Sequence, residues 1–206
     1  MTDGDVVHVV DDDEAVRSSL AFLLGSAGLQ VAVHPTAEAF LRAAEAEPVG
    51  CLLTDVRMPG LGGLELQARL QALGWQVPVV VITGHGDVPT AVQALKDGAL
   101  DFLEKPFDDE QLLDAVQRAL AAGRALRTSQ ATAQAAARRL GMLTPREREV
   151  LDGMVAGHAS KQIALDLGAS PRTIEVHRLR VMEKLQVRSL PELVRLVQAA
   201  MPDRSA

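Results

Sequence analysis

Acidic residues follow two apolar segments that have the composition of buried strands. Asp55 comes directly after the segment 49–54, and Asp11 and Asp12 come directly after the segment 6–10. Continuous aliphatic segments are typical of parallel strands buried on both faces, and α/β sheets bind ligands beyond the carboxyl ends of such strands. Carboxylates gathered at one edge repel one another, so the sequence predicts a hard divalent cation there, with Mg²⁺ as the natural candidate.

Two further strand-like segments end in residues that suit phosphoryl chemistry. Thr83 closes the segment 77–83, and Lys105 follows the segment 101–104. A carboxylate can attack a phosphoryl group when the charges of both are offset, which a divalent cation and Lys105 would do. Thr83 offers a hydroxyl donor for a phosphoryl oxygen, and Lys105-Pro106 is a candidate cis peptide. Asp55 is therefore the predicted nucleophile.

Five strand-like segments alternate with five helical patterns in the first part of the chain. The apolar spacing predicts strands at 6–10, 30–33, 49–54, 77–83 and 101–104, and helices at 15–27, 36–46, 62–73, 87–97 and 108–121. Parallel pairing with right-handed crossovers then gives an α/β fold, a doubly wound five-stranded parallel (βα)₅ sheet with helices on both faces.

The rest of the chain has helical signals only. Residues 122–141 are rich in Ala and predict a helical extension followed by a linker. Capping boxes, Ser-Pro starts and Gly stops then predict four short helices at 145–156, 160–167, 171–185 and 189–200. The expected organisation is a first domain at 1–121, an extension and linker at 122–141, and a second, all-α four-helix domain at 142–206.

Charge divides the chain in the same place. Residues 1–122 contain 7 Lys and Arg against 19 Asp and Glu, and residues 123–206 contain 14 against 8, so the halves carry −12 and +6 of the total of −6. This asymmetry predicts an acidic regulatory or catalytic half and a second half that meets a polyanion.

The lone cysteine and the absence of membrane signals bear on location. Cys51 lies in an apolar segment and has no cysteine partner, so it is expected in the core of a protein from a reducing compartment. The N-terminus has no basic segment before an apolar one, and no long apolar window is present. We therefore expect a cytoplasmic protein with no membrane partner.

Residues 1 to about 121 resemble the receiver domain of two-component response regulators. The resemblance rests on Asp11-Asp12, Asp55 with Met58-Pro59-Gly60, Thr83, and Lys105-Pro106. It implies that Asp55 accepts phosphate from a sensor histidine kinase and that Lys105 contacts this phosphate. It further implies that Mg²⁺ is bound by Asp11, Asp12, Asp55 and the Arg57 carbonyl, that Thr83 and Phe102 act as switch residues, and that phosphorylation produces a homodimer.

Residues 142–200 resemble the LuxR-type helix-turn-helix domain. The matching segments begin at Leu143-Thr144-Pro145-Arg146-Glu147, Lys161-Gln162-Ile163-Ala164 and Ser170-Pro171-Arg172-Thr173. Together with the receiver, the chain looks like a FixJ-type response regulator, which implies sequence-specific binding to promoter DNA and leaves contact with RNA polymerase open. Such a protein is not an enzyme beyond accepting a phosphoryl group from a donor and losing it again.

Helical geometry divides the segment 171–185 into two sides. At about 100° per residue, Ile174, Arg178, Val181 and Leu185 fall on the side expected to pack, although the head of Arg178 can reach a phosphate. The other side is expected in a major groove, with Glu175 on cytosine and Val176 and Leu179 on thymine methyl groups. The predicted DNA contacts are Lys161, Arg172, Thr173, Glu175, Val176, Arg178, Leu179 and Lys184.

The aromatic residues favour duplex DNA over a single strand. All four Phe and Trp75 precede residue 123, so the second half has no Phe, Tyr or Trp on which bases would stack. Double-stranded DNA is the better partner, read by a symmetric dimer as paired half-sites.

Three other functions are compatible with parts of the sequence. An aspartyl-phosphate hydrolase would also use an Asp nucleophile and Mg²⁺, but the D-x-D nucleophile pair and substrate cap of the haloacid-dehalogenase-like enzymes are not clearly present. An ATP-driven activator would need a G-x-x-x-x-G-K-[ST] loop, which the sequence lacks. A module that binds DNA without phosphorylation is disfavoured by the acidic residues but stays open.

Overall fold

The first half of the chain forms a five-stranded parallel sheet with the order β2-β1-β3-β4-β5. Its strands are β1 (Val6–Val10), β2 (Gln30–His34), β3 (Gly50–Asp55), β4 (Val79–Thr83) and β5 (Asp101–Glu104). Every pair of neighbours is parallel, so the predicted doubly wound (βα)₅ fold is confirmed. The inner strands β3 and β4 are almost entirely buried because helices cover both faces of the sheet, whereas β2 at the edge is partly exposed.

The computed structural model describes residues 4–44, 48–84 and 88–201. The chain divides into two units, Met1–Arg127 and Thr128–Ala206. The predicted helices 36–46 and 87–97 include residues 45, 46 and 87, and the predicted second domain includes 202–206, all of which lie outside the described residues. Across the described ranges, no helix is long and apolar enough to cross a bilayer.

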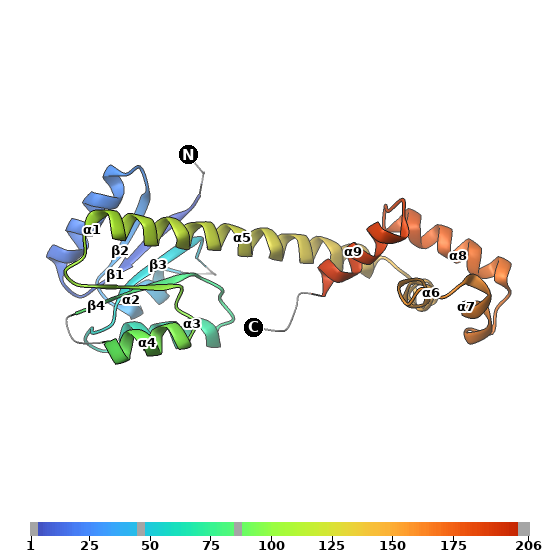
Figure 1. Ribbon diagram of the computed structural model, residues 1–206, viewed down its shortest axis with the longest axis horizontal. Coiled ribbons are helices and arrows are strands. Elements are labelled where there is room, and N and C mark those ends of the chain that lie inside the picture. Colours follow the sequence, from blue (N-terminus) through green and yellow to red (C-terminus); the bar gives the residue numbers. More distant parts are fainter. Residues whose placement is uncertain (1–3, 45–47, 85–87, 202–206) are drawn as a thin grey trace. The chain divides into compact units, whose positions relative to one another are not determined.

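Helices cover the sheet in two layers (Figure 1). Leu20 and Leu24 of α1 (Glu14–Ser26) and Leu112 and Val116 of α5 (Asp109–Gly141) pack into one core, together with β-strand residues such as Val7. The opposite core is closed by α2 (Ala37–Ala43), α3 (Gly63–Ala72) and α4 (Val88–Lys96). Figure 1 shows α5 on one side of the sheet and α3 and α4 on the other.

The strand register brings the carboxyl ends of the strands to one edge. Val10 pairs with Thr54, Asp55 with Ile82, and Thr83 with Glu104. The residues that follow β1, close β3 and β4, and follow β5 therefore share this edge, as the sequence pattern predicted.

Helix α5 continues without a break for 33 residues. The range 122–141, expected as a helical extension and linker, lies within it, because the Ala-rich composition of this range is that of a strong helix former. Gly123 allows the helix to approach the sheet, since a β-carbon there would lie 2.8 Å from the carbonyl oxygen of Gly50. The carboxylate of Asp5, next to β1, accepts hydrogen bonds from Arg124 and Arg127.

The second unit contains four further helices around one apolar core. They are α6 (Pro145–Val155), α7 (Ser160–Asp166), α8 (Pro171–Lys184) and α9 (Leu190–Ala200), as the sequence predicted. Thr144, Ser170 and Ser189 cap α6, α8 and α9 through their hydroxyl groups. The core centres on Val150, Ile163, Ile174, Val181, Leu185 and Leu193.

Candidate functional site

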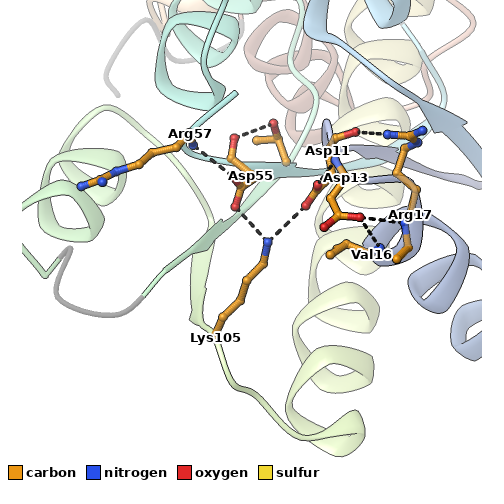
Figure 2. A network of polar contacts seen from close by, with 9 residues as sticks. Asp11, Asp13, Val16, Arg17, Asp55, Arg57 and Lys105 are labelled. Atoms are coloured by element: carbon orange, nitrogen blue, oxygen red, sulfur yellow. Dashed lines mark hydrogen bonds and ion pairs between the residues drawn. The ribbon is translucent and has the colours of Figure 1, made fainter. Parts of the chain in front are cut away.

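Lys105 holds two carboxylates together at the carboxyl edge of the sheet. Its ammonium nitrogen lies 3.1 Å from Asp55 Oδ1 and 3.2 Å from Asp11 Oδ2. Figure 2 shows the three side chains converging from the loop after β5 and from the ends of β3 and β1. The predicted cis peptide between Lys105 and Pro106 is present.

The loops on both sides of these carboxylates are held by hydrogen bonds (Figure 2). The Asp13 backbone N–H donates to Asp11 Oδ1 at 2.8 Å, and the Arg17 guanidinium donates to the Asp11 carbonyl at 2.7 Å. The Arg57 N–H donates to Asp55 Oδ2 at 3.2 Å. Gly63 lets α3 start directly behind this loop, since a β-carbon there would lie 2.3 Å from the Asp55 carbonyl oxygen.

The side chain of Asp13 caps the N-terminus of α1. Its carboxylate accepts from the backbone N–H groups of Ala15 and Val16 and so forms the N-cap of α1. The D-x-D pair of a phosphatase would need a second free carboxylate two residues after Asp11, and here that carboxylate serves the helix.

The electrostatics of the three residues are coupled. Burial raises the pKa of the Asp55 carboxyl, and the nearby Lys105 ammonium only partly opposes this. Burial alone would lower the pKa of Lys105, but the charges of Asp55 and Asp11 outweigh it and raise the pKa. The side chain of Asp55 is 13% exposed and that of Asp11 is 3% exposed, so the Asp55 carboxylate is the more accessible one.

The donor set fits Mg²⁺ although it is not a closed cage. Asp12 is exposed, and within the described residues no three acidic, His or Cys side chains converge closely enough to enclose a metal ion. Mg²⁺ commonly binds one or two carboxylates and keeps several waters. Asp11 and Asp55 supply two hard oxygen donors, and Asp12 and the Arg57 carbonyl lie beside them in the chain.

The two predicted switch residues lie on adjacent strands beside the site. Thr83 ends β4 and is 2% exposed, and its hydroxyl donates weakly to the Gly84 carbonyl at 3.4 Å. The backbone carbonyl of Thr83 accepts from the Lys105 N–H at 2.8 Å. Phe102 in β5 is half-buried and packs against the core on the α2–α4 face.

A groove of about 570 Å³ runs beside Lys105. Apolar residues of α1 and of the loop after β5 line it, among them Val16, Leu23 and Phe107. Phe22 of α1, at its border, is 78% exposed. An apolar groove bordered by an exposed aromatic side chain is a candidate interaction surface.

Helix α8 has the two sides that its sequence predicted. Ile174, Val181 and Leu185 are fully buried, and Arg178 is half-buried beside them. Val176 is 43% exposed and Leu179 is 64% exposed, although both are apolar. The other predicted DNA contacts on the open side of α8 are also exposed, namely Arg172, Thr173 and Glu175. Lys161 on α7 is exposed as well.

Two basic residues of α8 have features that the sequence did not predict. Lys184, expected at a DNA phosphate, donates to Glu147 Oε2 at 2.6 Å. Arg180 is exposed and lies eight residues after Arg172, on the same side of the helix, but was not among the predicted contacts. The helical period of 3.6 residues was the signal that pointed to it.

Family comparisons match both halves of the chain. Residues 7–117 match the response regulator receiver domain, and residues 141–197 match the luxR family of bacterial regulatory proteins. The two matches fall on the sheet that carries Asp55 and on the unit that carries α8.

Individual relatives match over nearly the whole length. The transcriptional regulatory protein FixJ of Azorhizobium caulinodans is 53% identical over 94% of this chain and 92% of its own. FixJ of Rhizobium meliloti is 50% identical over 94% and 95%. Among solved structures, the response regulator StyR is 44% identical with a TM-score of 0.83, covering 95% of this chain and 98% of its own. Full-length FixJ from B. japonicum is 49% identical with a TM-score of 0.60, covering 98% of both chains.

Proposed function

The chain belongs to the FixJ-type two-component response regulators, transcription regulators that join a receiver domain to a LuxR-family DNA-binding domain, and we propose that Mg²⁺-dependent phosphorylation of Asp55 controls its binding to DNA. The phosphodonor is a phosphohistidine of a sensor histidine kinase. The observation that carries this proposal is the position of Lys105, which bridges Asp11 and Asp55 at the carboxyl edge of the sheet.

Asp55 is the nucleophile in the proposed transfer. One carboxylate oxygen attacks the phosphorus atom, the bond from phosphorus to the histidine nitrogen breaks, and its electron pair stays on the imidazole, which takes up a proton from water. Lys105 offsets the charge that the incoming phosphoryl group adds beside Asp11. Asp11 and Asp12, with Asp55 and the Arg57 carbonyl, would hold Mg²⁺, whose charge would offset that of the phosphoryl oxygens.

Thr83 and Phe102 are the proposed switch. The weak hydrogen bond from the Thr83 hydroxyl to Gly84 is easily exchanged for a stronger one to a phosphoryl oxygen. Because Thr83 and Glu104 are paired in neighbouring strands, a shift of Thr83 reaches β5, which carries Phe102. The expected output is a homodimer. The groove beside Lys105 and the exposed Phe22 form the proposed docking surface for the kinase.

Helix α8 is the proposed recognition helix. Val176 and Leu179 present apolar surface that suits thymine methyl groups, and Glu175 suits the cytosine amino group. Arg172, Thr173, Arg178 and Lys161 are proposed phosphate contacts, to which the exposed Arg180 is added. Contact with RNA polymerase would follow at a promoter.

Light scattering on the full chain tests the proposal. The mass in solution is measured with and without Mg²⁺ and beryllofluoride, which mimics a phosphoryl group, and Asp55→Asn serves as the control. A dimer that forms only in the treated wild-type protein supports Asp55 as the switch. An unchanged mass, with binding of the mimic verified, refutes dimerisation as its output.

A further inference from the structure

The pair Glu147–Lys184 joins the first turn of α6 to the last turn of α8. Lys184 Nζ lies 2.6 Å from Glu147 Oε2, and the two residues are 37 positions apart. The side chain of Glu147 is 4% exposed, whereas that of Lys184 is 38% exposed. A buried carboxylate therefore holds a cation at the end of the recognition helix.

Glu147 also belongs to the cap of α6. Its Oε2 accepts from the Thr144 backbone N–H at 2.9 Å, while the Thr144 hydroxyl accepts from the Glu147 N–H at 3.3 Å. These bonds make a capping box that fixes the carboxylate in place. The hydrogen bonds from Lys184 and then from Thr144 lower the pKa of Glu147 to about 2, so it is ionised at neutral pH.

Lys184 lies at the border between the packed and the open side of α8. At about 100° per residue, it lies about 60° from the buried Val181 and about 40° from the exposed Arg180, so its ion pair with Glu147, and not its angle, separates it from the open side. The side chains of Arg172 and Arg180, in contrast, are exposed. A lysine that compensates a buried carboxylate cannot leave for a phosphate without stranding that charge.

We propose that Lys184 is a positioning residue that fixes the end of the recognition helix against α6 through Glu147, and that it makes no phosphate contact. The ion pair lies within one unit, so its effect on stability does not depend on the proposed function. Only its effect on DNA binding rests on the proposal that α8 is the recognition helix.

Thermal unfolding of the full chain tests the pair without DNA. Lys184→Met should lower the melting temperature of the second unit by about 10 °C or more, because it leaves Glu147 buried and uncompensated. Far-UV circular dichroism follows the unfolding of both units. The fluorescence of Trp75 follows the first unit alone, and the unfolding transition that it reports should be the same as in the wild type. Lys184→Arg should restore most of the loss, since it keeps a donor for the carboxylate. An unchanged melting temperature for Lys184→Met would overturn the inference.

The salt dependence of DNA affinity separates positioning from phosphate contact. In this measurement and the next, the protein is treated with Mg²⁺ and beryllofluoride. A mixed-sequence duplex is the probe, with Arg172→Met as the matched control. Each lost phosphate contact reduces the slope of log affinity against log salt by about 0.9. Arg172→Met should show this reduction and keep the melting temperature, whereas Lys184→Met should keep the wild-type slope. A reduced slope in Lys184→Met refutes the inference, and absence of any wild-type binding refutes the proposed function instead.

Sequence preference shows whether the pair does more than stabilise the fold. A duplex selected from a random pool by the wild-type protein is compared with the mixed-sequence duplex, well below the melting temperature of each variant. The ratio of affinity for the selected duplex to affinity for the mixed-sequence duplex should be at least about fivefold lower in Lys184→Met than in the wild type, since a shifted helix misplaces its base contacts. Lys184→Arg should restore this ratio. A preference that survives in Lys184→Met would reduce the pair to a stabilising contact and overturn the positioning role.

Discussion

The Lys105 ammonium lies 3.1 Å from Asp55 Oδ1, a residue 50 positions earlier in the chain. The parallel register makes this possible, because β3 and β5 both lie next to β4 and end at the same edge. The same ammonium reaches Asp11. A single cation thus stands where an added phosphoryl group would place further negative charge.

Replacing Lys105 with Met should slow phosphorylation of Asp55 by roughly 10²-fold or more, as expected when a preorganised donor to a developing anion is removed. The rate of phosphoryl uptake from a small acyl phosphate is the measurement. Lys96→Met, at the end of α4, is the matched control and should keep the wild-type rate. A variant at Lys105 that is phosphorylated as fast as the wild type would remove Lys105 from the mechanism.

Replacing Gly63 with Ala should destabilise the first unit by about 1–3 kcal/mol, because the new methyl group would lie 2.3 Å from the Asp55 carbonyl oxygen and force backbone to move. Denaturant unfolding followed by Trp75 fluorescence gives the free energy. Gly25→Ala, in α1 with no atom within 4 Å of the added carbon, is the control. That control should be stabilising by about 0.5–1 kcal/mol, since Ala is the better helix former.

Replacing Gly123 with Ala should weaken the packing of α5 on the sheet. The added carbon would lie 2.8 Å from the Gly50 carbonyl oxygen, so the helix would have to move away from β3. Amide hydrogen exchange should become faster in the middle of α5. In Gly141→Ala, where the added carbon meets no atom within 4 Å, the same amides should exchange at the wild-type rate. Equal exchange in both variants would contradict a tight approach at Gly123.

His8 should make the stability of the first unit dependent on pH. Burial, followed by the neighbouring His34, lowers the pKa of His8 to about 4, and the two rings are joined at 3.3 Å. His8 takes up a proton near pH 6.5 in the unfolded chain, but only near pH 4 in the folded protein. The contribution of neutral His8 is therefore complete above about pH 6.5 and is lost as the pH falls toward 4.

Unfolding free energies measured across this pH range for the wild type and for His8→Phe test the effect. The difference in unfolding free energy between the two proteins should change between pH 6.5 and pH 4 and should be constant above pH 6.5. A constant difference would mean that His8 is protonated equally in both states.

The strands and the acidic site could be predicted because they depend on local patterns. Each strand is a continuous aliphatic segment, and parallel topology brings the ends of the strands together, so Asp11, Asp55 and Lys105 were placed from spacing alone. Asp12 shows the limit of this reasoning, since adjacent residues of one loop point in different directions and only Asp11 is buried.

The contacts that sequence reasoning missed are those between distant side chains. Asp5 pairs with Arg127 across 122 positions, and Lys184 pairs with Glu147 across 37. Their residue types are the same as those of solvated surface charges, so no local period distinguishes them. Lys184 was expected at a phosphate for that reason.

The strand order also determines when the site can form during synthesis of the chain. β1 is made first but lies between β2 and β3, and the bond from Lys105 to Asp11 spans 94 positions. A ribosome must therefore release nearly the whole first unit before the two carboxylates acquire their cation. Contacts across such separations form slowly, because a long loop must be closed first. A nascent chain that stops before β5 would carry Asp55 without Lys105, and so without the cation that is proposed to assist its phosphorylation.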